Sequence, residues 1–320
     1  MTNEKLRIVF FGTAEFAVPS LESLIDAGHE ILAVVTQPDK PQGRGRLVLP
    51  SPVKVAALAH NLPVLQPKRV RSESFLQKMR DLSPDLLALA AFGQVIPQAL
   101  LDLPLLGPIN VHGSLLPKYR GAAPIQRAIM AGESVAGVTT MWMDASLDTG
   151  DMLLKASIPV EIDDTSGTLI EKLALLGAGL LIETLEGLIA GTLPRIPQDH
   201  SEATLAPAIL PEEGEIRWNE SATQIRNRVR SMLPKPGAYT ELNGKRLKIW
   251  GMEIVEGAPE LQRAPGTVVQ IQKRPAGALV SAGSGTLTLL TEVQPESGKR
   301  MSAADWARGT RLEAGNRFGA

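Results

Sequence analysis

Residues 7–36 are RIVFFGTAEFAVPSLESLIDAGHEILAVVT, and this stretch decides the fold. The apolar run Arg7–Phe11 ends at Gly12 and predicts a buried strand. A helix is expected over Pro19–Ala27, and a second strand over Ile31–Thr36. A strand, a helix and a further strand in immediate succession are typical of a parallel sheet with helices packed against it.

The same alternation continues along the chain. Further strands are expected at Leu86–Ala91, Ile109–His112 and Val138–Met143, and further helices at Val53–His60, Ser72–Leu82 and Thr165–Ala190. We therefore expect an α/β domain with a parallel sheet over residues 1–191, whose ligands would bind beyond the carboxyl ends of the strands. Gly12 lacks the further glycines of a dinucleotide-binding loop, so no nicotinamide cofactor is expected.

The pattern changes after the last of these helices. Residues 192–210 contain several prolines and little periodicity, which predicts an extended linker. Residues 211–320 contain one expected helix, Thr223–Ser231, and several short strands separated by Gly, Asn and Pro. These strands are expected at Ala238–Leu242, Leu247–Trp250, Gly266–Gln270, Ala278–Ser281 and Leu287–Thr291. The second domain is therefore expected to be smaller and mostly β.

Composition restricts the class of protein. A chain of 320 residues with 44% hydrophobic residues is typical of a soluble globular protein with one or two domains. The chain has no cysteine, which excludes disulfides and fits a reducing cytoplasm. Its four histidines are scattered without ligand spacing, so no metal is expected. The apolar stretch Leu173–Ile182 is too short to span a bilayer, and no secretory segment is recognised.

The net charge of −1 conceals an asymmetry. Residues 1–210 carry 17 Lys and Arg against 22 Asp and Glu, a net charge of −5, whereas residues 211–320 carry 16 against 12, a net charge of +4. A basic second domain favours a polyanionic partner. The alternative is an ordinary solvated surface, and the charge alone leaves that alternative open.

Polar side chains gather at the end of one expected strand. Asn110 and His112 point to the same face because side chains alternate along a strand, and Leu147-Asp148-Thr149-Gly150-Asp151 follows. An amide donor beside an imidazole suits a developing oxyanion, and a carboxylate can orient the imidazole. The alternatives are a hydrogen-bonded polar pair and a tight turn. Cysteine is absent and Ser114 has no obvious partner base, which favours direct transfer over a covalent acyl-enzyme.

Several motifs together carry a family resemblance. The segments His112-Gly-Ser-Leu-Leu-Pro-Lys-Tyr-Arg-Gly121 and Leu147–Met152 closely resemble the formyltetrahydrofolate-dependent transferases. Arg7–Thr13, Gln37–Arg46 and Lys235-Pro-Gly-Ala-Tyr239 are similar to segments of the methionyl-tRNA formyltransferases. The resemblance covers nearly the whole chain.

The resemblance implies a fold and an activity. It implies a Rossmann-like formyltransferase catalytic domain at 1–191, a linker at 192–210 and an OB-like, tRNA-binding barrel at 211–320. It implies transfer of a formyl group from 10-formyltetrahydrofolate to the α-amine of methionyl initiator tRNA, for translation initiation, in a cytoplasmic monomer. Asn110, His112 and Asp148 would be the catalytic residues.

The resemblance also implies binding residues. The folate would contact a wall formed by Ser114, Leu115, Leu116 and Pro117, and its pterin would contact Phe92, Gly93, Gln94, Val95 and Ile96, with Asp144 as a further candidate. The family usually has glycine where this chain has Ser146. The tRNA would contact Arg44, Arg46, Arg226, Arg230, Lys245 and Lys248.

Two other classes of function remain open. Another formyltetrahydrofolate-dependent transferase would share Asn110, His112 and Asp148 but act on a small amine, such as an amino sugar or glycinamide ribonucleotide. A tRNA-binding protein with an inactive α/β domain is the second alternative, and the intact set of three polar residues argues against it.

Overall fold

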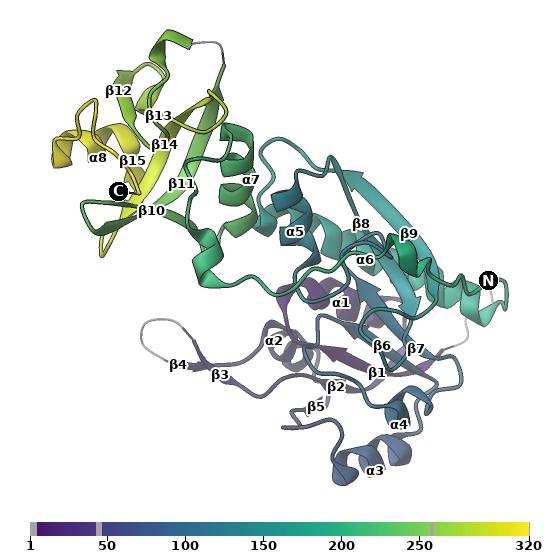
Figure 1. Ribbon diagram of the computed structural model, residues 1–320. Coiled ribbons are helices and arrows are strands. Elements are labelled where there is room, and N and C mark those ends of the chain that lie inside the picture. Colours follow the sequence, from purple (N-terminus) through teal and green to yellow (C-terminus); the bar gives the residue numbers. More distant parts are fainter. Residues whose placement is uncertain (1–4, 43–46, 257–258, 320) are drawn as a thin grey trace. The chain divides into compact units, whose positions relative to one another are not determined.

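The computed structural model describes residues 5–42, 47–256 and 259–319 (Figure 1). The chain forms two compact units. The first consists of Met1–Pro124, Val135–Pro159 and Leu169–Pro207, and the second of Ile125–Ser134, Val160–Thr168 and Ala208–Ala320. The second unit thus includes two segments from the range that we expected for the catalytic domain, and most of the expected linker belongs to the first.

A seven-stranded sheet forms the centre of the first unit, in the order β5-β2-β1-β6-β7-β8-β9. Its strands are β1 Arg7–Gly12, β2 Glu30–Val35, β5 Val64–Leu65, β6 Leu86–Ala90, β7 Pro108–His112, β8 Val135–Trp142 and β9 Met152–Pro159. The strands from β5 to β7 are parallel, as expected. The strands β8 and β9, however, are antiparallel to their neighbours, because a loop of a few residues can join β8 to β9 only as a hairpin.

Helices cover the sheet and pack against its apolar side chains. They are α1 Val18–Asp26, α2 Pro52–Ala59, α3 Glu73–Leu82, α4 Gln98–Leu101 and α6 Ser166–Ile189, and a separate two-stranded hairpin consists of β3 Lys40–Gln42 and β4 Leu47–Leu49. Val9 and Phe11 of β1 pack in one cluster with Phe75 and Met79 of α3. On β7, Val111 packs against α6, where a Cβ at Gly177 would lie only 2.7 Å from a Val111 methyl group.

The second unit contains a mostly antiparallel sheet, in the order β10-β11-β14-β13-β12, with β15 paired to β14. Its strands are β10 Ala238–Leu242, β11 Lys245–Val255, β12 Val268–Lys273, β13 Ala276–Ser281, β14 Leu287–Pro295 and β15 Met301–Ser302, and its helices are α5 Pro124–Ala131, α7 Ala222–Met232 and α8 Ala303–Thr310. Trp218 and Trp306 stack against Phe318 in its core. The expectation of a mostly-β second domain is confirmed.

The helix α5 contacts this second unit through Met130, which packs against its core, and through an ion pair. Both terminal nitrogens of Arg127 donate to the Glu213 carboxylate, at 2.5 and 2.9 Å. The Glu213 pKa is lowered, first of all by the hydrogen bond from Arg127.

Over the described ranges of the chain, no helix is both long and apolar enough to cross a membrane.

Candidate active site

Asn110 and His112 lie at the carboxyl end of β7, between β6 and β8. Asn110 pairs with Leu89 on one side and Met141 on the other, so the backbone at this position is held by two neighbours. The Asn110 side chain is partly exposed, whereas His112 is 6% exposed. With Val111 directed at α6, the alternation along the strand leaves the amide and the imidazole on the opposite face, as the sequence predicts.

The structure brings Asp148 to His112. The carboxylate atom Oδ1 lies 3.6 Å from Nδ1 of the imidazole, close enough for ion pairing but beyond an ordinary hydrogen bond. The other ring nitrogen, Nε2, lies 2.9 Å from the carbonyl oxygen of Tyr119 and therefore donates to it. The imidazole is thus held at Nε2 by a backbone carbonyl and faces the Asp148 carboxylate at Nδ1.

Asp148 lies in the loop between β8 and β9 and has a left-handed backbone, with φ of 52°. Its second carboxylate oxygen accepts a 2.8 Å hydrogen bond from the backbone nitrogen of Gly121. Two residues later, Gly150 must be glycine, because a Cβ there would lie 1.9 Å from the carbonyl oxygen of Trp142. The loop is thus compressed against β8, and the carboxylate points back toward the strand end that holds His112.

Asp144 stabilises the same loop. Its carboxylate accepts hydrogen bonds from the Ser146 backbone nitrogen at 3.0 Å and from Thr149 Oγ1 at 2.7 and 2.8 Å. Among the described residues of this loop, the left-handed position is Asp148 and not Ser146, so the loop has no positive φ at the position where the family usually has glycine.

The segment Ser114–Pro117 divides into supporting and exposed residues. Ser114 Oγ donates to the Lys118 carbonyl at 2.6 Å, and Thr139 Oγ1 ties this segment to β8 by bonding the Ser114 carbonyl and the Leu116 nitrogen. Ser114 and Leu116 are buried, whereas Leu115 and Pro117 are partly exposed. Of the predicted folate wall, the last two can touch a ligand.

The segment Phe92–Ile96 follows β6 and divides in a similar way. Phe92 and Ile96 are buried, and Thr13 Oγ1 donates to the Phe92 carbonyl at 2.8 Å. The Gln94 side chain accepts from the Val70 nitrogen at 3.2 Å, so it braces a neighbouring loop. Gly93 and Val95 are exposed, Val95 by 78%. The backbone between them is therefore the part of the segment that is open to a ligand.

The sequence analysis missed residues 198–206, which lie in the expected linker. Gln198 Nε2 donates to the carbonyls of Asp148 and Gly150, at 2.9 and 2.7 Å. Thr204 Oγ1 accepts from the Tyr119 nitrogen at 2.8 Å. No periodicity marks these contacts, because an extended segment that binds loops has no repeating apolar face. The sequence signal for these contacts is limited to one glutamine, Gln198, between Pro197 and Pro207.

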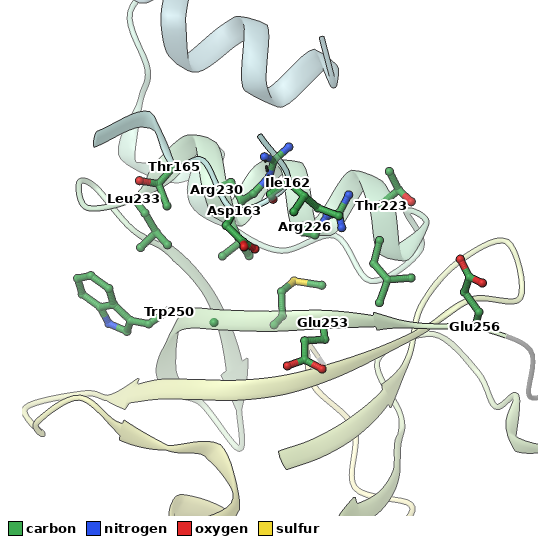
Figure 2. A pocket seen from close by; sticks show the side chains of 14 residues that line it. Ile162, Asp163, Thr165, Thr223, Arg226, Arg230, Leu233, Trp250, Glu253 and Glu256 are labelled. Carbon is green, nitrogen blue, oxygen red and sulfur yellow. Dashed lines mark hydrogen bonds between the residues drawn. The ribbon is translucent and has the colours of Figure 1, made fainter. Parts of the chain in front are cut away.

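Of the predicted tRNA contacts, Arg44 and Arg46 lie outside the described residues. Arg226 and Arg230, one turn apart on α7, border a cavity of about 710 Å³ beside β11 (Figure 2). Asp163, Glu253 and Glu256 line the same cavity, so its charge is mixed. Lys245 is exposed at the start of β11, whereas Lys248 donates to the Pro236 carbonyl at 2.9 Å.

Arg230 is engaged within the second unit. One of its nitrogens bonds the carbonyls of Glu161, Ile162 and Asp164, at 3.0 to 3.1 Å. Burial, and then the nearby charge of Arg226, lower the Arg230 pKa. Its other terminal nitrogen bonds the Asn227 side chain at 3.0 Å, so the guanidinium has little capacity left for phosphate.

Comparisons with known proteins establish the family of this chain. The family model described as formyl transferase matches residues 6–185, and the model for the formyl transferase C-terminal domain matches residues 208–311. A methionyl-tRNA formyltransferase of Moorella thermoacetica is 47% identical over 314 residues, which cover 98% of this chain and 99% of that protein. The corresponding protein of Bacillus subtilis is 46% identical, covering 98% of each chain.

Solved structures show the same fold at low identity. An N-formyltransferase from Helicobacter canadensis, solved with folinic acid and dTDP-3-aminofucose, matches with a TM-score of 0.67 and 18% identity, over 92% of this chain and all of that one. HypX from Aquifex aeolicus, solved with tetrahydrofolic acid, matches with a TM-score of 0.64 and 17% identity, over 95% of this chain and 47% of that one. The chain is therefore an enzyme of the formyl transferase family.

Proposed function

We propose that this enzyme transfers the formyl group of 10-formyltetrahydrofolate to the α-amine of methionine on initiator tRNA, giving formylmethionyl-tRNA for translation initiation. Formyl transfer is supported by Asn110 and His112 at the end of β7 and by the approach of Asp148 to His112. Transferases for small amines would share these residues, so the tRNA acceptor is supported by the similarity of the whole chain, which is 47% identical over nearly its whole length to a protein named methionyl-tRNA formyltransferase. We also infer that the enzyme works in the cytoplasm as a monomer.

The residues suit a direct transfer. As the acceptor amine attacks the formyl carbon, a C–N bond forms, negative charge develops on the formyl oxygen, and the bond from that carbon to N10 then breaks. The Asn110 amide can donate to the charged oxygen, and the His112 imidazole can donate a hydrogen bond or help to move a proton. Asp148, 14% exposed and within ion-pairing distance of His112, can accept the amine proton through water, and N10 receives one proton as it leaves.

The donor is expected to lie along two exposed stretches of the first unit. The open backbone at Gly93 and Val95 offers the alternating donors and acceptors that a pterin edge requires, without the need for polar side chains. Leu115 and Pro117 offer partly exposed apolar surface for the ring. For tRNA, exposed Lys245 and the predicted contacts Arg44 and Arg46 supply positive charge.

Product identification tests this proposal. The wild-type enzyme is incubated with charged initiator tRNA and 10-formyltetrahydrofolate carrying a labelled formyl carbon, and the amino acid is released by mild base. The label is expected in N-formylmethionine, and Asp148→Asn, which tolerates the left-handed backbone, should slow its appearance by at least about 10². The proposal would be overturned if the enzyme formylated small amines while the methionine released from the tRNA carried no label.

A further inference from the structure

Asp148 adopts a backbone conformation that a residue with a side chain avoids. Its φ of 52° lies in the left-handed region, where Asp is tolerated but not favoured. A carboxylate that must face His112 therefore depends on surrounding groups that hold the loop in this conformation. The Gly121 nitrogen fixes the carboxylate itself, and it leaves the main chain of the loop to be held by other groups.

The side chain of Gln198 holds that main chain. Its Nε2 atom has two hydrogens, and it lies 2.9 Å from the Asp148 carbonyl and 2.7 Å from the Gly150 carbonyl. Each carbonyl can therefore receive one hydrogen, and the pair of bonds spans the turn on both sides of Thr149. Gln198 is 6% exposed, so water is largely excluded from these bonds.

Arg120 fixes the orientation of this amide. The Oε1 atom of Gln198 accepts from Nε of Arg120 at 3.1 Å and from Nη2 at 2.7 Å. A reversed amide would place its NH₂ group against the guanidinium and its oxygen against the two carbonyls, so only one orientation is possible. The guanidinium is 7% exposed, and Nη2 also lies 3.1 Å from Nδ1 of His200.

The main chain ties the two segments together. The Arg120 nitrogen donates to the Thr204 carbonyl at 2.8 Å, and the Ala206 nitrogen donates to the Arg120 carbonyl at 2.6 Å. Arg120 also lies between Tyr119, whose carbonyl bonds His112, and Gly121, whose nitrogen bonds Asp148. One rigid cluster thus connects Gln198 to both catalytic side chains.

We propose that Gln198, oriented by Arg120, is a positioning residue that holds Asp148 in its left-handed conformation for the reaction. This inference rests on the proposed function, because it assigns to Asp148 the role given there. Gln198 touches neither the reacting atoms nor the side chain of His112; it acts through the Asp148 backbone. The segment 192–207 is then a part of the catalytic apparatus and not only a connection between domains.

The test uses the full-length enzyme and two substitutions that separate the donors from the acceptor. Gln198→Glu keeps an acceptor for Arg120 and loses both donors, whereas Gln198→Met is similar in shape and loses all four bonds. Both should lower kcat by at least about tenfold, with KM for each substrate changed less than about threefold. Gln77→Glu, on the exposed face of α3, is the matched control and should retain wild-type kinetics.

A double-mutant cycle separates positioning from simple stability. In an Asp148→Asn background, Gln198→Met should lower kcat by a further factor of less than about three, because its effect acts through Asp148. Equal factors in both backgrounds, wild-type kcat in either single variant, or loss of folded protein in both would overturn the inference.

A readout without turnover keeps the two proposals distinct. Amide hydrogen exchange at residues 147–151 should be faster in Gln198→Met than in the wild type, and unchanged in Gln77→Glu. If the wild type transferred no formyl group but the exchange difference were present, the proposed function alone would be refuted. An unchanged exchange pattern in Gln198→Met would refute the positioning role alone.

Discussion

Nδ1 of His112 lies 3.6 Å from Oδ1 of Asp148, although the two residues are 36 positions apart in the sequence. Two different devices produce this approach. β7 presents His112 at its carboxyl end, and the loop between β8 and β9, which leaves the sheet beside Ile109, folds back and brings Asp148 to His112. The catalytic proposal follows from this approach, and the following predictions test it together with the binding assignments.

Single substitutions at the three polar residues should impair turnover without unfolding the protein. Asn110→Ala, His112→Ala and Asp148→Ala should each lower formyl transfer by at least about 10², because each removes a group that stabilises charge or moves a proton. Single-turnover kinetics, with far-ultraviolet circular dichroism for the fold, measure the effect. Combined variants should lose far less than the product of the single losses, since the residues act as one unit. Near-normal turnover in a folded variant would exclude that residue from the mechanism.

Lys245 and Arg230 should behave differently. Lys245→Ala should weaken tRNA binding and reduce the slope of log K against log salt by about 1, because an exposed lysine can release one counterion from the nucleic acid. Lys273→Ala, exposed on β12, is the matched control. Unchanged salt dependence in Lys245→Ala would contradict the assignment.

Arg230→Ala should instead lower stability. It removes Nη1, whose two hydrogens are shared among the carbonyls of Glu161, Ile162 and Asp164, and a bond from a charged donor contributes about 1.5–3 kcal/mol. Thermal unfolding of the full chain measures the loss. A variant with normal stability and weak tRNA binding would show instead that Arg230 contributes to tRNA binding.

The segment Asp39–Arg46, which contains β3 and the predicted tRNA contacts Arg44 and Arg46, should act on tRNA and not on folate. Its base is clamped, since Lys54 Nζ donates to Asp39 at 2.6 Å and to Gln66 at 2.9 Å. Arg44→Ala should cut transfer to tRNA sharply and leave folate affinity almost intact, and Arg44→Lys should rescue only partly, because an ammonium lacks the planar fork. Steady-state kinetics beside equilibrium folate binding decide this, with exposed Arg71→Ala as the control. Equal losses in both measurements would assign the loop to the folate site.

The Arg127–Glu213 pair should give the second unit a defined acid sensitivity. Hydrogen bonding from Arg127 lowers the Glu213 pKa, so the pair stabilises the folded state fully above the unfolded value, about 4.3. This contribution is lost as the pH falls through the lower folded value. Glu213→Gln should therefore unfold at a lower temperature than wild type at neutral pH, and the difference should shrink toward pH 3. The exposed Glu296→Gln should show no such convergence, and a constant difference for Glu213→Gln would contradict the pairing.

Much of the fold could be predicted because the apolar pattern reflects burial directly. The runs at β1, β2, β6 and β7 are buried strands, and α6 ends within one residue of its expected boundary. The strand β9 was missed; its first two residues are buried and the other six alternate between partly buried and exposed, so no single period describes it. The helix α5 was not among the expected elements.

The candidate site could be predicted only where the arrangement of side chains follows from their positions along one strand. Asn110 and His112 are two residues apart on a strand, so their common face follows from the period of the strand. The roles of Gln198 and Thr204 depend on where an extended segment crosses two loops, and that crossing is set by tertiary packing. The surroundings of Arg230 could not be predicted for a similar reason. Its position on α7 predicts a free basic face, but the carbonyls that occupy it come from residues 161–164.

The central claim is that the acceptor is the amine of methionine on tRNA, and one competition experiment tests it most directly. The wild-type enzyme receives labelled 10-formyltetrahydrofolate and a mixture of methionyl initiator tRNA, a dTDP-amino sugar and glycinamide ribonucleotide. The account predicts that kcat/KM for the tRNA exceeds that for either small amine by at least about 10². A higher kcat/KM for a small amine would contradict it and identify this chain as a transferase for that amine.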